Sequence, residues 1–251
     1  MLLVLLPNSK STDGYEWVVV AFSIAQIVLN YYRLCTNSNI VSPIVDKGLQ
    51  NKQWSYCVRC KIMRPPRAHH CAACETCILK RDHHCYFAFT CVGMNNFRYF
   101  FLLLFYILLF SLYTFLHFIS YASQEYRKEL KQVTDYPILT FIFPPWSLIL
   151  VLTGELPFIV FYYNVCSCIC SLFSACATFY LGWGLTVLLD GQTSSEALQG
   201  EKKYHLGMYR NIKEVFGSYP FVNFIFPFKS RLNSDGYDFE LNPIHREVSL
   251  L

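Results

Sequence analysis

Cysteine and histidine are concentrated in one short stretch of this 251-residue chain. Seven of its twelve cysteines lie within the 35 residues from Cys57 to Cys91. Two tetrahedral zinc sites need eight ligands. Six cysteines and two histidines supply eight, which leaves one thiol over with a histidine two residues before it. A spare thiol beside a spare base on a metal-bound scaffold indicates a nucleophile. The side chains concerned are Cys57, Cys60, Cys71, Cys74, Cys77, Cys85 and Cys91, with His69, His70, His83 and His84.

The spacing of these residues is typical of metal ligands. Cys57 and Cys60 form a C-x2-C pair, and two more such steps run from Cys71 through Cys74 to Cys77. Each step lets two sulfurs point at one ion. Residues 33–98 carry ten Lys or Arg against three Asp or Glu, which favours the cytoplasmic side of a membrane. Because that compartment is reducing, clustered cysteines there favour metal over disulfides.

The apolar residues, 54% of the chain, gather in runs long enough to cross a bilayer. The runs at 15–34, 99–121 and 158–189 are predicted transmembrane helices. If the cysteine-rich segment and the polar C-terminal region both face the cytoplasm, the number of crossings between them is even. Residues 137–156 are then expected to be re-entrant or interfacial. A competing solution has four crossings, with residues 158–189 split in two.

These features predict an all-α, multi-pass membrane protein with a small cytosolic zinc-stapled cysteine-rich domain between its helices. Its expected parts are an N-terminal transmembrane helix in 1–34, the zinc domain in 35–98, a transmembrane hairpin in 99–189 and a cytosolic region in 190–251. Aromatic residues within 219–228 are expected to contact the bilayer surface. The last 20 residues are polar and are expected to be disordered.

The cysteine-rich segment resembles that of the DHHC family of protein S-acyltransferases, or palmitoyltransferases. Thr193-Ser194-Ser195-Glu196 resembles the family's TTxE motif, with Ser194 for the second Thr. The pattern departs from the family at Tyr86-Phe87, where Pro-Trp is usual, and at Thr90, where Asn is usual. Only one helix instead of two precedes the zinc domain, which suggests a truncated N-terminus. The matching positions are Cys57, Cys60, Arg64-Pro65, Arg67, His70-Cys71, Cys74, Cys77, Asp82-His83-His84-Cys85, Cys91, Asn96 and Phe100.

The resemblance implies two CCHC zinc sites whose ligands interleave along the chain. It also implies that Cys85 is the nucleophile, His83 the base and Asp82 the residue that orients His83. A free thiol is mostly protonated at neutral pH, and an imidazole held by a carboxylate favours its ionisation. The implied ligands are Cys57, Cys60, His70 and Cys77 for one zinc ion and Cys71, Cys74, His84 and Cys91 for the other.

The implied reaction has two steps. Cys85 takes a palmitoyl or similar long acyl group from acyl-CoA and passes it to a cysteine of a protein substrate. Lys61, Arg64 and Arg67 are candidates for binding the CoA phosphates. The expected cofactors and partners are two Zn²⁺ ions, acyl-CoA, cysteine-bearing membrane-associated proteins and the lipid bilayer, with no nucleic acid. The implied location is the endoplasmic reticulum or Golgi membrane, with the active site facing the cytoplasm.

Two other functions fit part of the pattern. A RING-type ubiquitin ligase also joins zinc to membrane helices, but its ligands need a longer middle loop and a paired distal C-x2-C, and this sequence has neither. A non-catalytic membrane adaptor that keeps the zinc fold stays open as an alternative, because of Tyr86-Phe87 and the single N-terminal helix. Thr193 and Glu196 also fit a plain helix cap.

Overall fold

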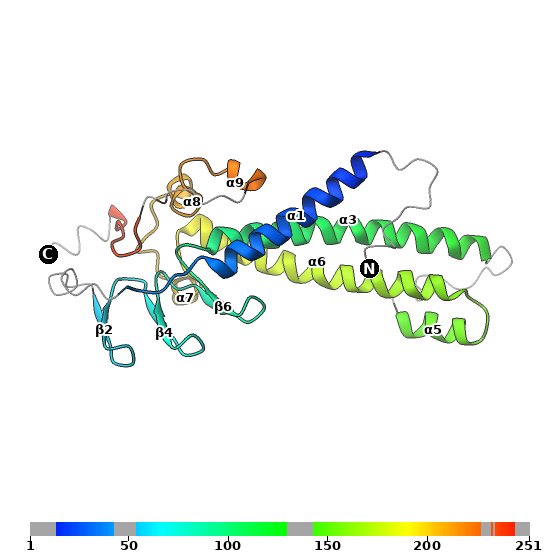
Figure 1. Cartoon of the computed structure of the whole chain (residues 1–251), viewed down its shortest axis with the longest axis horizontal. Coiled ribbons are helices and arrows are strands. Elements are labelled where there is room, and N and C mark those ends of the chain that lie inside the picture. Colours follow the sequence, from blue (N-terminus) through cyan, green and yellow to red (C-terminus); the bar gives the residue numbers. More distant parts are fainter. Residues whose placement is uncertain (1–13, 43–53, 130–142, 227–231, 233, 244–251) are drawn as a thin grey trace. The chain divides into compact units, whose positions relative to one another are not determined.

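The computed structural model describes residues 14–42, 54–129, 143–226, 232 and 234–243 (Figure 1). Three of its helices are long and apolar enough to cross a membrane. They are α1 (Gly14–Thr36), α3 (Phe97–Glu129) and α6 (Phe158–Asp190). At about 1.5 Å per residue each exceeds the hydrocarbon thickness of about 30 Å. The chain is therefore a mostly helical membrane protein, as the apolar runs predict.

The segment between α3 and α6 contains a short helix, α5 (Pro144–Leu152), with proline in its first turn. Nine residues rise only about 14 Å, which is too short to cross the hydrocarbon core. The next helix, α6, is continuous over its 33 residues. The alternative that splits residues 158–189 into two crossings is therefore wrong. Residues 137–142 of the predicted re-entrant segment lie outside the described residues.

The chain divides into two compact units, of which the first comprises the described residues up to Ile24 and those from Leu104 to Tyr180. Small polar side chains join α3 to α6 in this unit. The hydroxyls of Ser111 and Ser174 are 2.7 Å apart, and Thr114 Oγ1 lies 3.3 Å from Cys170 Sγ. Membrane helices commonly pack in this way, because small side chains allow close approach and a hydroxyl finds its partner on the neighbouring helix.

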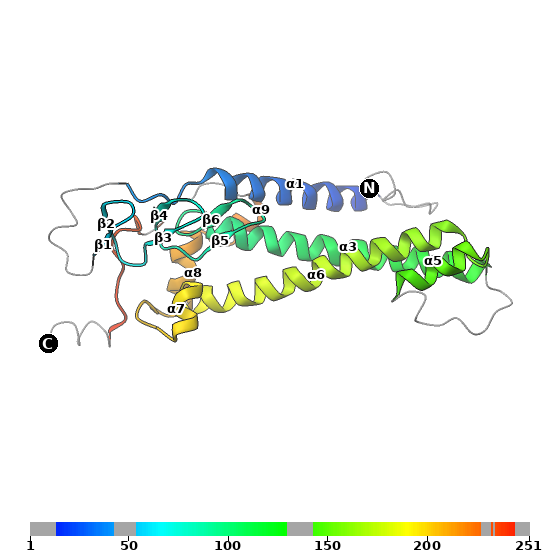
Figure 2. The same cartoon turned by 90° about the horizontal axis from the view of Figure 1, so that it is seen from below.

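The second unit comprises the described residues in 25–103 and 181–251. Its cysteine-rich part consists of three antiparallel hairpins that follow one another toward α3 (Figure 2). Strands of three residues are too short to be stable by themselves, so other bonds must hold them. The hairpins pair β1 (Ser55–Cys57) with β2 (Ile62–Arg64), β3 (His69–Cys71) with β4 (Thr76–Ile78), and β5 (His83–Cys85) with β6 (Thr90–Val92).

The three hairpins share one loop geometry. In each, a cysteine ends the first strand and a four-residue turn follows. The last residue of the turn has a positive φ: 56° at Lys61, 52° at Glu75 and 49° at Phe89. A left-handed residue before the second strand is what closes a loop of this length. The repetition of the geometry means that the cysteines opening the three loops occupy equivalent positions.

Three short helices follow α6: α7 (Ser194–Gln199), α8 (Met208–Phe216) and α9 (Val222–Ile225). The segment after them returns to the zinc domain. Tyr237 stacks on Trp54 with ring centroids 6.1 Å apart, and its hydroxyl accepts a hydrogen bond from the Ser42 N–H at 3.1 Å. Leu232 and Phe239 pack with Tyr237 against the buried cluster around Leu79. The prediction of a disordered tail is therefore wrong for its described part, because partly buried aromatic rings pack it against the zinc domain.

Candidate active site and metal centres

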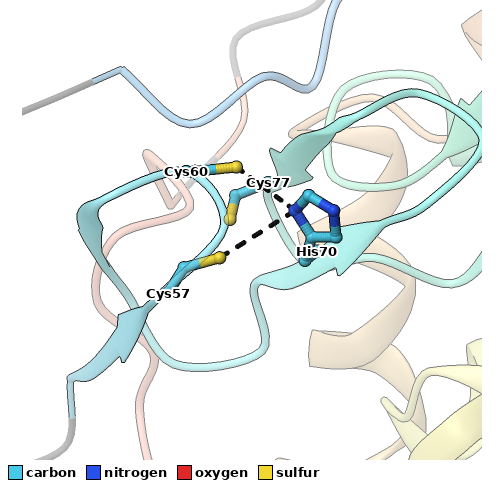
Figure 3. Close-up of side chains that lie close together, drawn as sticks. All are labelled: Cys57, Cys60, His70 and Cys77. Carbon is cyan, nitrogen blue, oxygen red and sulfur yellow. Dashed lines mark hydrogen bonds between the residues drawn. The ribbon is translucent and has the colours of Figure 1, made fainter.

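Two groups of three cysteines and one histidine bring their ligand atoms within 4.8 Å of one another. In the first, His70 Nδ1 lies 3.2 Å from Cys60 Sγ and 3.9 Å from Cys57 Sγ (Figure 3). In the second, the sulfurs of Cys74 and Cys91 are 3.6 Å apart. A tetrahedral zinc ion separates a sulfur ligand from a nitrogen ligand by about 3.6 Å and two sulfurs by about 3.8 Å. Both groups fit zinc; they are Cys57, Cys60, His70 and Cys77, and Cys71, Cys74, His84 and Cys91.

Each group draws its ligands from two consecutive hairpins. The last residue of the first strand and the following loop of one hairpin supply the C-x2-C pair, and the strands of the next hairpin supply a histidine and a cysteine. His70 and Cys77 are cross-strand partners, and so are His84 and Cys91. Residues directly opposite each other on antiparallel strands lie close on the same face. A metal ion in each group would therefore join neighbouring hairpins that have little apolar core of their own.

The third hairpin has the form of the first two but lacks their second cysteine. Cys57, Cys71 and Cys85 recur at intervals of 14 residues and hold the same place in the register, opposite Ile62, Thr76 and Thr90. The partner cysteines of the first two loops are Cys60 and Cys74, and the equivalent residue of the third is Ala88. Cys85 thus has no knuckle partner, and it belongs to neither of the two ligand groups found among the described residues.

Next to Cys85 lies a hydrogen-bonded series of polar side chains. The His83 Nδ1–H donates to Asp82 Oδ2 at 2.8 Å. The same carboxylate accepts from Ser194, whose N–H lies 2.7 Å from Oδ1 and whose Oγ lies 2.9 Å from Oδ2. Ser194 Oγ in turn accepts from Trp183 Nε1 at 2.9 Å. Asp82 is buried, and the ring of His83 also packs edge-on against Phe100. These bonds leave His83 with Nε2 as its outer nitrogen.

The pKa values of these side chains support an ionised pair. Burial raises the pKa of the Cys85 thiol, but His83 and the backbone N–H groups of Ala88 and Phe87 outweigh it, so the net shift is downward. Burial lowers the pKa of His83, yet Asp82 and Cys85 raise it to about 9. Burial raises the pKa of Asp82, but its hydrogen bonds to His83 and Ser194 lower it by more, so the net shift is downward. Each charge therefore stabilises the next.

Arg67, a predicted phosphate ligand, forms a buried ion pair with Glu196. Its Nε and Nη2 donate to the two oxygens of Glu196 at 2.9 and 2.6 Å, and Nη2 also donates to the Gly191 carbonyl at 2.9 Å. The guanidinium lies 4.4 Å from the centroid of Tyr204, and its side chain is 3% exposed. Nε and Nη2 of Arg67 are therefore engaged inside the fold. A contact of Arg67 with the CoA phosphates stays a prediction.

Glu196 joins this ion pair to a capping box. Thr193 is the N-cap of α7, its hydroxyl accepts the Glu196 N–H, and the Glu196 carboxylate accepts the Thr193 N–H. Thr193 and Glu196 therefore form a helix cap, and the same cap is the structural role of this TTxE-like motif. The cap sets the first turn of α7, and this turn presents the N–H and hydroxyl of Ser194 to Asp82.

The remaining predicted residues lie on the outer hairpins. Arg64 Nε donates to Ser55 Oγ at 2.7 Å, and Lys61 is the left-handed residue of the first loop. His69 is exposed on β3. Sequence reasoning missed the contact of Ser194 with Asp82, which joins residues 112 positions apart. It also missed the 14-residue interval of Cys57, Cys71 and Cys85, which was visible in the sequence and identifies Ala88 as a replaced ligand.

Comparison with known proteins agrees with this arrangement. The family model of the DHHC palmitoyltransferase matches residues 50–201, more than half of the chain and the part that holds both metal groups, Asp82 to Cys85 and α7. The chain is 29% identical over 243 residues to "Probable palmitoyltransferase ZDHHC24" of Danio rerio, covering 94% of this chain and 80% of the relative.

Two further relatives agree. The ZDHHC24 protein of Rattus norvegicus is 33% identical over 200 residues, covering 78% of this chain and 67% of the relative. "Palmitoyltransferase ZDHHC9" of Bos taurus is 38% identical over 112 residues, covering 42% and 31%. The extent of these matches, together with two zinc-fitting groups and a cysteine outside both, leads to one conclusion: the chain belongs to the DHHC palmitoyltransferase family of acyltransferases.

Proposed function

We propose that the chain moves a palmitoyl or similar long acyl group from acyl-CoA to cysteines of membrane-associated proteins through a thioester on Cys85. The observation that carries the proposal is the place of Cys85 in a hairpin shaped like a zinc knuckle, in which Ala88 stands where the second cysteine ligand would be. A thiol so placed stays free of metal and next to His83. Its lowered pKa favours the thiolate, the nucleophilic form.

In the first step the Cys85 thiolate attacks the thioester carbonyl of acyl-CoA. The bond to the CoA sulfur breaks as the bond to Cys85 forms, and protonated His83 can give its proton to the departing CoA thiolate. In the second step neutral His83 takes a proton from the acceptor thiol, which attacks the Cys85 thioester and releases the Cys85 thiolate. One thioester replaces another in each step, so no oxidant or nucleotide is needed.

Asp82 and Ser194 act on this reaction through His83. The carboxylate holds the Nδ1–H of the ring, so Nε2 is the nitrogen that exchanges protons with sulfur. Ser194 holds the carboxylate with two hydrogen bonds and prevents it from turning. We regard both as positioning residues.

The two zinc ions would be structural. Their proposed ligands are Cys57, Cys60, His70 and Cys77, and Cys71, Cys74, His84 and Cys91. Four protein ligands complete a tetrahedron and leave no open position for substrate. The metal would supply folding energy to three short hairpins. His84 and Cys91 flank the nucleophile, so the second ion would also hold Cys85 in position.

For the CoA phosphates we retain Lys61 and Arg64 as proposed contacts. The bond from Arg64 to Ser55 uses one of the five N–H donors of a guanidinium. The excess of basic residues in 33–98 supports a cytoplasmic orientation. The substrates would accordingly be proteins at the cytoplasmic face, and we propose the endoplasmic reticulum or Golgi membrane as the location.

The deciding experiment labels the purified full-length chain in lipid nanodiscs with a clickable palmitoyl-CoA analogue. We expect hydroxylamine-sensitive labelling that Cys85→Ser abolishes while zinc content stays at two ions per chain by mass spectrometry. Cys176→Ser, which removes an exposed thiol from α6, is the matched control and should label normally. Labelling of Cys85→Ser at the wild-type level, or no transfer from labelled wild type to an acceptor cysteine peptide, would refute the proposal and favour an adaptor.

A further inference from the structure

The loop that follows Cys85 presents three aromatic side chains outward. Tyr86 is 76% exposed, Phe87 63% and Phe89 85%, whereas Ala88 is buried at 4%. The equivalent loops of the other two hairpins are Val58-Arg59-Cys60-Lys61 and Ala72-Ala73-Cys74-Glu75, with a charged residue at the fourth position. The third loop replaces that charge with Phe89. We name residues 86–89 the aromatic loop.

The backbone of the aromatic loop is strained at its most exposed residue. Phe89 has a φ of 49°, in the left-handed region that bulky residues disfavour. The same conformation closes the other two loops at Lys61 and Glu75, so the hairpin geometry accounts for it. What distinguishes the third loop is that this position holds an aromatic ring that is 85% exposed, where the other two hold a charged side chain.

The position of the aromatic loop beside α1 indicates which partner its exposed rings contact. The ring centroid of Phe87 lies 5.8 Å from that of Tyr31, and the Cys35 thiol donates to the Ala88 carbonyl at 3.7 Å. Tyr31 and Cys35 are one turn apart in α1, a helix apolar enough to cross the membrane over Gly14–Thr36. The loop therefore runs beside the last turns of a membrane-crossing helix, continuous with its lipid-exposed surface.

A second aromatic segment contacts the same helix. Gln26 Nε2 of α1 donates to the Ile225 carbonyl of α9 at 2.5 Å. Next to this bond the side chains of Tyr219, Phe221 and Phe226 are 71%, 85% and 64% exposed. Gln26 and Tyr31 are separated by about 7.5 Å along the helix axis. Aromatic residues gather at this depth in membrane proteins, because their rings are stable at the boundary of headgroups and acyl chains.

We propose that the aromatic loop inserts into the cytoplasmic-side boundary of the lipid bilayer, with Tyr86, Phe87 and Phe89 among the lipid headgroups and upper acyl carbons. The partner is lipid, because the loop continues the surface of α1 and carries no charged side chain. The insertion does not depend on the proposed reaction. If that reaction holds, the loop also keeps Cys85 at the depth where a membrane-dissolved acyl chain ends.

The test compares two hairpin positions that differ only in their proposed surroundings. Tyr86 and Val58 both open their loops, with exposures of 76% and 78%. The full-length variants Tyr86→Trp and Val58→Trp are placed in nanodiscs, and the wild-type signal of the four native tryptophans is subtracted. We expect the tryptophan at 86 to emit at shorter wavelength, to be quenched by lipids brominated at carbons 6 and 7, and to resist iodide. The tryptophan at 58 should emit at longer wavelength, should be quenched by iodide and should not be quenched by brominated lipid.

Iodide quenching at 86 as strong as at 58, with no quenching by brominated lipid, would overturn the proposal. In that case the rings would face water in the lipid-bound chain, and the loop would be a contact surface for a protein partner that is absent from the nanodisc. The readout is independent of acyl transfer, so failure of insertion and failure of the proposed reaction are distinguishable. A Phe89→Trp variant repeats the measurement at the strained position, with Lys61→Trp as its equivalent in the first hairpin.

Discussion

Ser194 holds both oxygens of the Asp82 carboxylate, through its N–H to Oδ1 at 2.7 Å and its hydroxyl to Oδ2 at 2.9 Å. The two residues come from segments 112 positions apart. Asp82 precedes the histidine that faces Cys85, and Ser194 is the first residue of a capped helix. The link makes the first turn of α7 a support of the proposed active site, and it gives a reason for a hydroxyl at this position of the motif.

Removal of the Ser194 hydroxyl should slow acylation without unfolding the chain. Ser194→Ala keeps the N–H bond to Asp82 and loses the Oγ bond. A hydrogen bond to a charged group contributes about 1.5–3 kcal/mol, so we expect a rate about tenfold lower, measured by single-turnover labelling with palmitoyl-CoA. Ser194→Thr should restore the rate, and Ser195→Ala on the same turn should leave it unchanged. An equal loss in Ser194→Ala and Ser195→Ala would show that the effect belongs to the helix and not to the carboxylate.

The pH dependence of Cys85 reactivity should depend on Asp82. The carboxylate stabilises protonated His83, whose pKa is raised to about 9, and the imidazolium stabilises the thiolate. Asp82→Asn should therefore let the pKa of His83 fall toward its ordinary 6.5 and that of Cys85 rise toward its ordinary 9. The alkylation rate of Cys85 by iodoacetamide, followed against pH by mass spectrometry, should have its midpoint at higher pH in the variant. An unchanged midpoint would contradict the assigned coupling.

The buried pair of Arg67 and Glu196 should be required for folding. Their side chains are 3% and 11% exposed, and removing one partner of a buried pair costs about 3–5 kcal/mol. Arg67→Met alone should lower the thermal midpoint strongly, while Arg67→Met with Glu196→Leu should recover part of the loss because no unpaired charge remains. Thermal unfolding in detergent measures both. If the single variant were as stable as wild type yet needed more palmitoyl-CoA, Arg67 would be a substrate contact after all.

The adjacent histidines should separate by metal content. His83→Ala is expected to keep two zinc ions per chain and to acylate Cys85 more slowly, because its Nδ1 bonds to Asp82 and not to a metal group. His84→Ala should lose zinc and stability, since its Nδ1 lies 3.3 Å from Cys74 Sγ. Metal analysis and labelling on the same preparations decide the matter. Loss of metal in both variants to the same extent would remove the proposed division of roles.

Restoring the missing knuckle cysteine should inhibit the enzyme reversibly. Ala88 is buried at 4% at the position that Cys60 and Cys74 hold in the other loops. Ala88→Cys places a second thiol where Cys85 can share a metal ion with it. We expect labelling of this variant to be inhibited by micromolar zinc and recovered with a weak chelator, whereas Ala88→Ser stays insensitive. If zinc did not inhibit labelling of Ala88→Cys, the third hairpin would not place thiols at positions 85 and 88 where they can bind one metal ion.

Local patterns predicted the features that depend on local sequence. The apolar runs begin and end within a few residues of α1 and α6, because the composition needed to cross lipid is a property of each run alone. The C-x2-C steps likewise point to the two groups that fit zinc. Ser194 on Asp82, Glu196 on Arg67 and Tyr237 on Trp54 escaped prediction because each joins segments far apart in the chain. A serine beside a helix cap looks the same in sequence whether or not a carboxylate lies in front of it.

The middle hairpin, β3 with β4, contributes His70 and Cys77 to one metal group and Cys71 and Cys74 to the other. Loss of either ion would release two of its four ligands and loosen the shared strands that present the remaining two. We therefore expect demetallation to be cooperative, with both ions leaving over one narrow range of chelator concentration. Acyl transfer would then respond to zinc supply as a threshold and not in proportion.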